Sequence, residues 1–133
     1  MSNFLSKKLI SLNINKSSKQ SNLANYKPYV IDQNIVFISG QLPIKEQVLL
    51  FNGKVGESIN AEETKNSIQL ATYNLLWVLS DAMDEYKNVK NTKCLNIKGY
   101  LNCTDNFDEH SILFDTASDI LVKILGQKSG SHS

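Results

Sequence analysis

Two long stretches of this sequence repeat apolar residues at three- and four-residue steps, and each must cover its apolar side with other parts of the chain. The first starts at Asn60, which fits a capping box with Glu63, and runs to about residue 85. The second covers about residues 107–125 and stops at Gly126. The expected apolar positions are Ile68, Ala71, Leu75, Val78 and Ala82, followed by Phe114, Ala117, Leu121 and Ile124. The pattern predicts two amphipathic helices that share one core.

Three shorter segments have the composition of β-strands. Residues 29–31 and 35–38 are apolar and mostly β-branched or aromatic, and the turn between them, which contains Asn34, indicates a hairpin. The second segment is apolar on both faces, so we expect it in the centre of a sheet. Residues 93–102 alternate apolar and polar side chains, as in a strand with one buried face. The sequence thus predicts an α+β domain with both long helices on one face of the sheet.

The chain has the length of one domain, so we expect a single domain over residues 1–133. Apolar side chains at Leu5, Leu9 and Leu12 predict a short amphipathic helix at the N-terminus. The stretch from Ile14 to Gln20 is polar and resembles a linker. Residues 1–20 are therefore expected to form an N-terminal helix and linker within this domain.

Charge and composition argue against several classes of protein. The net charge is +1, with no basic cluster of the kind that nucleic acid requires, and none of the 14 basic residues is an arginine. No apolar run is long enough to span a membrane, and the first residues lack the apolar core of a signal peptide. We therefore expect neither a nucleic-acid partner nor a membrane partner.

The two cysteines do not look like a disulfide pair. Cys94 and Cys103 are nine residues apart in one extended segment, which would separate their Cα atoms by about 30 Å. Free thiols fit a cytoplasmic location. No cysteine or histidine, including His110 and His132, has a zinc-like spacing to a partner, so no metal is expected.

One segment, Ser39-Gly40-Gln41-Leu42-Pro43, carries a family resemblance together with its flanks. Ala24-Asn25-Tyr26 precedes it and Gly53-Lys54-Val55-Gly56 follows it. In this order the segments resemble the RidA/YjgF (Rid) family, in the branch with an extra N-terminal helix. Further matching positions are Glu62-Glu63, Gln69, Gly99-Tyr100-Leu101-Asn102 and Ala117-Ser118-Asp119. The resemblance implies a chorismate-mutase-like fold and a homotrimer.

The resemblance also implies a function. Well-known family members hydrolyse reactive enamines and imines of the 2-aminoacrylate type to 2-keto acids and ammonia, without a cofactor. Their ligand, a small carboxylate-bearing imine or enamine, binds in a cleft between subunits. Matched position by position, Tyr26, Ser39 and Gly40 would line that cleft. A backbone N–H beside a glycine can approach an anion closely, and a phenol offers one donor.

The family's substrate-binding arginine has no counterpart in these 133 residues. Gly130-Ser131-His132-Ser133 fits the stretch that leads into the arginine-bearing strand, so we expect the strands after Gly126 to be missing and the chain to be C-terminally incomplete. The family's arginine and glutamate are both absent, which leaves the catalytic residues unassigned. The expectation is deaminase-like chemistry in the complete protein and none in this chain. The alternatives are a non-catalytic ligand-binding or trimeric interaction module, and an inactive fragment of a broken reading frame.

Each candidate residue also has a purely structural interpretation. Ser39 and Gly40 could shape the bend after a strand, and Tyr26 could be a packed aromatic residue. Cys103 is expected to be structural, because no flanking cation activates its thiol, and His110 is expected to be solvated. Gly53 and Gly56 are expected in turns, since no phosphate-binding spacing surrounds them. The sequence also lacks the paired histidines that RNA cleavage would need.

Overall fold

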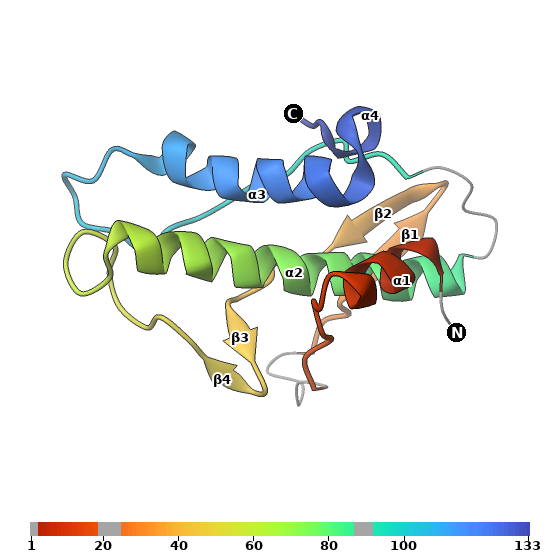
Figure 1. Cartoon of the computed structure of the whole chain (residues 1–133), viewed down its shortest axis with the longest axis horizontal. Helices are drawn as coiled ribbons and strands as arrows, with labels where there is room; N and C mark the ends of the chain where they lie inside the picture. The colour runs from red at the N-terminus through yellow and green to blue at the C-terminus, as the bar shows by residue number, and fades with distance from the viewer. Residues whose placement is uncertain (1–2, 19–24, 87–91) are drawn as a thin grey trace.

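The structure is a computed structural model that describes residues 3–18, 25–86 and 92–133. The longest helix contacts both a second long helix, which runs beside it, and a β-hairpin (Figure 1). The elements in chain order are α1 (Phe4–Ser11), β1 (Tyr29–Asp32), β2 (Ile35–Ile38), β3 (Ile44–Lys45), β4 (Val48–Leu49), α2 (Ala61–Glu85), α3 (His110–Leu125) and α4 (Gln127–Gly130).

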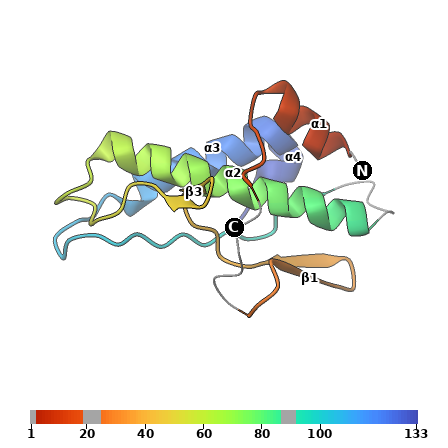
Figure 2. The same ribbon diagram turned by 90° about the horizontal axis from the view of Figure 1, so that it is seen from below.

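Helix α2 organises the molecule, because α1, α3 and the hairpin β1–β2 all contact it. Figure 2 shows the long helices α2 and α3 on one side, and the hairpin with the extended chain before α3 on the other. The two long helices therefore share one face of an extended layer, as the sequence predicts. The mixed α+β class is confirmed.

The core of the molecule lies between the helices. Leu76 of α2 is fully buried and Leu121 of α3 is 1% exposed. The apolar face of α2 differs from the expected one: Ala71, Leu75 and Val78 are only half-buried. The side chains buried instead include Leu76, Leu79 and Met83, which pack with Leu5, Leu9 and Leu121. The reason is that α1 and α3 cover α2 on a different side from the hairpin, so its buried surface is wider than one stripe.

The helix boundaries follow from local chemistry. Asn60 accepts a hydrogen bond from the Glu63 backbone N–H at 2.8 Å, and the Glu63 carboxylate accepts one from the Asn60 N–H at 3.2 Å. This confirms the predicted capping box of α2. At the end of α3, Gly126 takes φ +93°, a conformation that favours glycine and ends the helix as predicted.

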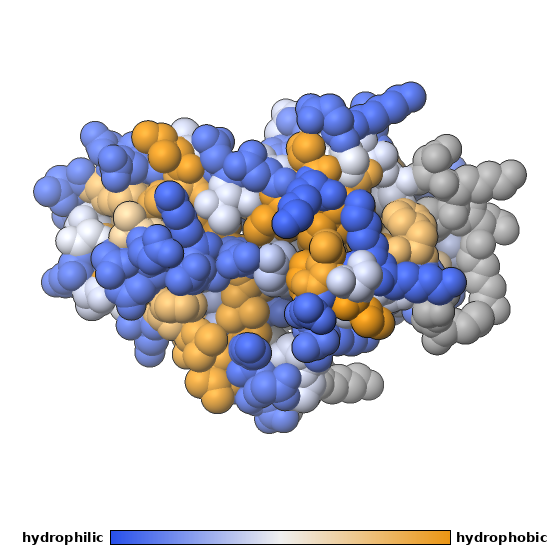
Figure 3. Space-filling model, viewed as in Figure 1, coloured by the Kyte–Doolittle hydropathy of each residue, from blue (hydrophilic) through white to orange (hydrophobic). Residues whose placement is uncertain are grey.

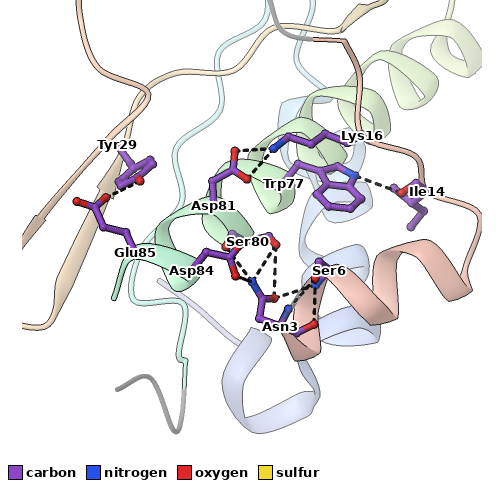
Figure 4. Close-up of polar contacts among 10 residues, drawn as sticks. All are labelled: Asn3, Ser6, Ile14, Lys16, Tyr29, Trp77, Ser80, Asp81, Asp84 and Glu85. Atoms are coloured by element: carbon purple, nitrogen blue, oxygen red, sulfur yellow. Dashed lines mark hydrogen bonds and ion pairs between the residues drawn. The ribbon is translucent and has the colours of Figure 1, made fainter. Parts of the chain in front are cut away.

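Helix α1 is held on α2 by one polar side chain (Figure 4). Asn3 Oδ1 accepts from the Ser6 N–H at 2.9 Å and so caps α1. Its Nδ2 donates to Ser80 O at 3.0 Å and to Asp84 Oδ1 at 2.9 Å, both on α2. The predicted N-terminal helix is therefore confirmed and attached to the core.

The predicted hairpin is confirmed, but its place in a larger sheet is not. β1 and β2 pair antiparallel in the register Tyr29↔Ile38 and Val30↔Phe37, with Gln33 and Asn34 at positive φ in the turn. Within the described residues, β2 pairs with β1 alone, so the expected central position is wrong. The strand that would lie beside β2 is not formed by residues 93–102.

Residues 93–102 run extended without forming the predicted strand. The backbone of this segment forms hydrogen bonds with the end of the chain instead. The Cys94 N–H donates to Ser129 O at 2.7 Å, and the Ile97 N–H donates to Ser133 O at 3.1 Å. Leu95, expected on the buried face, is 59% exposed. A Cβ on Gly99 would lie 2.2 Å from the Phe114 ring, so this segment is packed closely under α3.

Candidate functional site

The three predicted ligand-binding residues lie together at the open end of hairpin β1–β2. The Ser39 N–H donates to Pro28 O at 2.9 Å, and its Oγ donates to Lys27 O at 2.6 Å. Ser39 and the adjacent Gly40 are thus held against the segment that carries Tyr26. The hairpin pairing brings the segments that carry these residues, which are separated in sequence, side by side.

The surroundings of each residue limit its role. The Ser39 hydroxyl donates its proton to the backbone oxygen of Lys27, so it can act towards a ligand only as an acceptor. No heavy atom lies within 4 Å of the Cβ that a side chain at Gly40 would have, so the backbone there is open to approach. Tyr26 is 65% exposed, which shows that it is not a packed aromatic residue in the single chain.

A separate hollow of about 340 Å³ lies between the hairpin and the end of α2. Its lining residues are Lys27, Pro28, Tyr29, Val30, Ile31 and Glu85. The Tyr29 hydroxyl donates to the Glu85 carboxylate, and this hydrogen bond, together with burial, raises the pKa of the phenol to about 12 (Figure 4). The phenol is therefore neutral, and its proton is already donated to Glu85. None of the three predicted ligand-binding residues lines this hollow.

The sheet surfaces expose large apolar side chains. Val30 and Phe37, a cross-strand pair, are 52% and 59% exposed. On the face seen in Figure 3, apolar residues gather over β3 and β4, where Val48 is 56% exposed. Exposed apolar residues grouped on sheets are typical of protein interfaces.

Sequence reasoning missed two contacts made by histidines. His110 Nε2 lies 3.4 Å from Cys103 Sγ, and His132 Nε2 lies 2.9 Å from Ser118 Oγ. Cys103 precedes α3 and His110 begins it, so the turn between them creates the contact. No spacing rule for metal sites or catalytic motifs signals such a pair.

Two negative findings concern only the described residues. No three His, Cys, Asp or Glu side chains there gather as they would around a metal ion. None of the helices in that part of the chain combines the length and apolar character needed to cross a membrane. Cys94 and Cys103 are both free thiols.

Comparison with known proteins gives consistent matches. Residues 6–133 match the family model described as "YjgF/chorismate mutase-like, putative endoribonuclease". A crystal structure from Shewanella oneidensis MR-1, titled as that of a "putative endoribonuclease", superposes with a TM-score of 0.78 at 29% identity. The match covers 98% of this chain and 85% of the Shewanella chain.

Two further proteins are similar over most of the chain. The Agrobacterium tumefaciens protein Atu1372, of unknown function, has a TM-score of 0.78 at 22% identity, over 98% of this chain and 78% of its own, which supports the fold. Protein TCP17 of Trypanosoma cruzi is 26% identical over 109 residues, which are 82% of this chain and 67% of TCP17.

Proposed function

Because this chain belongs to the YjgF/chorismate-mutase-like family, we propose that it provides the scaffold of an enamine/imine deaminase of the Rid type. In that reaction water adds to the C=N carbon of a 2-imino acid, the C–N bond breaks, and ammonia and a 2-keto acid leave. The observation that carries the proposal is that the hydrogen bonds of Ser39 to Lys27 and Pro28 join the segment of the exposed Tyr26 to the segment of the open Gly40 backbone. These groups suit a small polar ligand.

We further propose that these 133 residues bind such a ligand without hydrolysing it. The substrate carboxylate needs a fixed cation, and the planar fork of an arginine is the side chain that pairs with it in two parallel hydrogen bonds. The sequence contains 14 lysines and no arginine. A lysine offers a mobile point charge, which orients a carboxylate less firmly.

The proposed ligand site lies between copies of the chain in a cytoplasmic homotrimer. The exposed cross-strand pair of Val30 and Phe37 supports an interface on the outer face of the hairpin. Tyr26, Ser39 and Gly40 lie outside the hollow between the hairpin and α2, and a neighbouring copy would supply the second wall of their site. The free thiols fit a reducing compartment.

The alternative is a non-catalytic ligand-binding or trimeric interaction module, and the same exposed face supports it. The two proposals differ in one measurable respect. A deaminase scaffold gains turnover when an arginine-bearing strand is appended, whereas an interaction module assembles in the same way but releases no additional ammonia.

RNA cleavage is named in the family description, but the geometry of the histidines does not favour it for this chain. His110 begins α3, and His132 contacts Ser118, eight residues further along the same helix. At 1.5 Å per residue these two helix positions lie about 12 Å apart along the axis, and each imidazole contacts another side chain, so the two histidines are not paired with each other. The test of the deaminase proposal is ammonia release from a 2-aminoacrylate-type enamine by the chain with an arginine-bearing strand appended, measured against the spontaneous rate.

A further inference from the structure

A cysteine and a histidine contact each other at the end of the molecule where the chain enters α3. Cys103 Sγ lies 3.4 Å from His110 Nε2, within the range of a sulfur–nitrogen hydrogen bond. Both residues are half-buried, so part of each residue is open to solvent. An imidazole at this distance can accept the thiol proton as the sulfur attacks an electrophile, which is how paired cysteines are activated.

Both partners are fixed in place. Cys103 forms an isolated β-bridge with Val55. In this bridge the Val55 N–H donates to Asn102 O at 2.9 Å, and the Thr104 N–H donates to Val55 O at 3.0 Å. The Phe107 ring meets the His110 ring edge-on, with the centroids 4.9 Å apart. The Cys–His geometry is therefore held by two independent contacts outside the pair.

The second cysteine offers a contrast within the same chain. Burial raises the pKa of the Cys94 thiol, and its Sγ donates to Asn96 O at 3.9 Å. Among its hydrogen-bond partners there is no base within the described residues. Cys94 therefore serves as an internal reference for a thiol without assistance.

From this geometry we propose that Cys103 is a base-assisted nucleophile that adds to small, uncharged activated alkenes. The sulfur bonds to the β-carbon of an α,β-unsaturated carbonyl compound and the C=C π bond opens. The thiol proton passes through His110 to the α-carbon, so no atom leaves and no oxidant is needed. This activity is independent of the proposed deaminase site.

The surroundings select this class of electrophile. Cys103 and Phe107 both pack against the apolar cluster that contains Val55 and Leu113, which favours a small apolar molecule. The loop between the cysteine and the histidine carries three carboxylates, from Asp105, Asp108 and Glu109. Their negative charge disfavours anionic electrophiles.

The test is the rate at which acrylamide labels each cysteine of the 133-residue chain near neutral pH, followed by mass spectrometry of the peptides. We expect Cys103 to react at least about tenfold faster than Cys94, given the usual contribution of a positioned base. His110→Gln should slow labelling of Cys103 on the order of tenfold or more. In His110→Ala, imidazole added to the buffer should restore part of the rate, which a merely structural histidine would not allow.

His132→Gln is the matched control, because it removes the other histidine, and should leave the rate at Cys103 unchanged. Equal rates at the two cysteines of the wild type would overturn the proposal whether or not the variants fold. So would a His110→Gln protein that folds, by circular dichroism, and labels as fast as the wild type.

Discussion

Val30 and Phe37 face each other across the hairpin β1–β2, and more than half of each side chain is open to solvent. Their neighbours in the register, Tyr29 and Ile38, lie against α2 and the core. The hairpin thus has one face on the core and one apolar face outward. An outward apolar pair costs solubility unless something covers it.

We expect this face to mediate self-association. Phe37→Lys should shift the chain towards monomer, because it places a charge in the centre of an apolar contact. Analytical ultracentrifugation of the two proteins measures the change. Ile112→Lys, at a 64% exposed position of α3, is the control of equal charge. If both variants sediment like the wild type, the interface lies elsewhere.

The Asn3 side chain should contribute more to the free energy of unfolding than an ordinary helix cap does. Asn3→Ala removes the cap of α1 together with the donors to Ser80 and Asp84, with an expected loss of about 1–3 kcal/mol in the free energy of unfolding. Asn3→Ser keeps a capping oxygen and should lose only part of this. Urea unfolding of the three proteins gives the values. Equal stability of Asn3→Ala and wild type would show that α1 is held by its apolar contacts alone.

The sequence predicted the elements whose signals are local. The span of α2, its capping box at Asn60 and the stop at Gly126 each depend on neighbouring residues, and all three are confirmed, although the buried face of α2 differs from the expected one. No local signal marks the small hairpin β3–β4. Its turn places Glu46 and Gln47 at positive φ, and neither is a residue type that indicates such a turn.

Features that depend on distant contacts were the ones missed. The alternation at residues 93–102 is real, but the partners of that segment are decided by where Ser129 and Ser133 lie. The Cys103–His110 contact likewise depends on how the loop before α3 folds back. For the candidate ligand site, the hairpin pairing explains how Ser39 comes to lie against the segment that follows Tyr26, while the roles of both residues remain predictions.

The Tyr29–Glu85 hydrogen bond should stabilise the fold over a defined range of pH. The pKa of Tyr29 is raised from 10.0 to about 12, so the protonated phenol favours the folded state. This contribution is complete below pH 10 and is lost as the pH rises towards 12. In a spectrophotometric titration, the Tyr29 phenol should ionise late, towards pH 12, and Tyr29→Phe should remove that late phase. An unchanged titration curve would contradict the assignment.

Tyr26→Phe tests the proposed ligand surface. Loss of one hydrogen bond should weaken binding of a 2-keto acid such as 2-oxobutanoate by about two- to tenfold, with little effect on folding. An NMR titration measures the affinity. Tyr100→Phe, at an 85% exposed tyrosine, is the control. A loss of the same size in both variants would remove Tyr26 from the site.

The most direct test compares ammonia release from a 2-aminoacrylate-type enamine by three proteins. They are the 133-residue chain, the same chain extended by the arginine-bearing and final strands of a family member, and the extended chain with that arginine changed to lysine. We predict the spontaneous rate for the first, a clear acceleration for the second, and loss of most of it for the third, because lysine keeps the charge without the planar fork. Equal acceleration by the first and second proteins would show that the chemistry does not depend on an arginine, and would contradict the proposed mechanism.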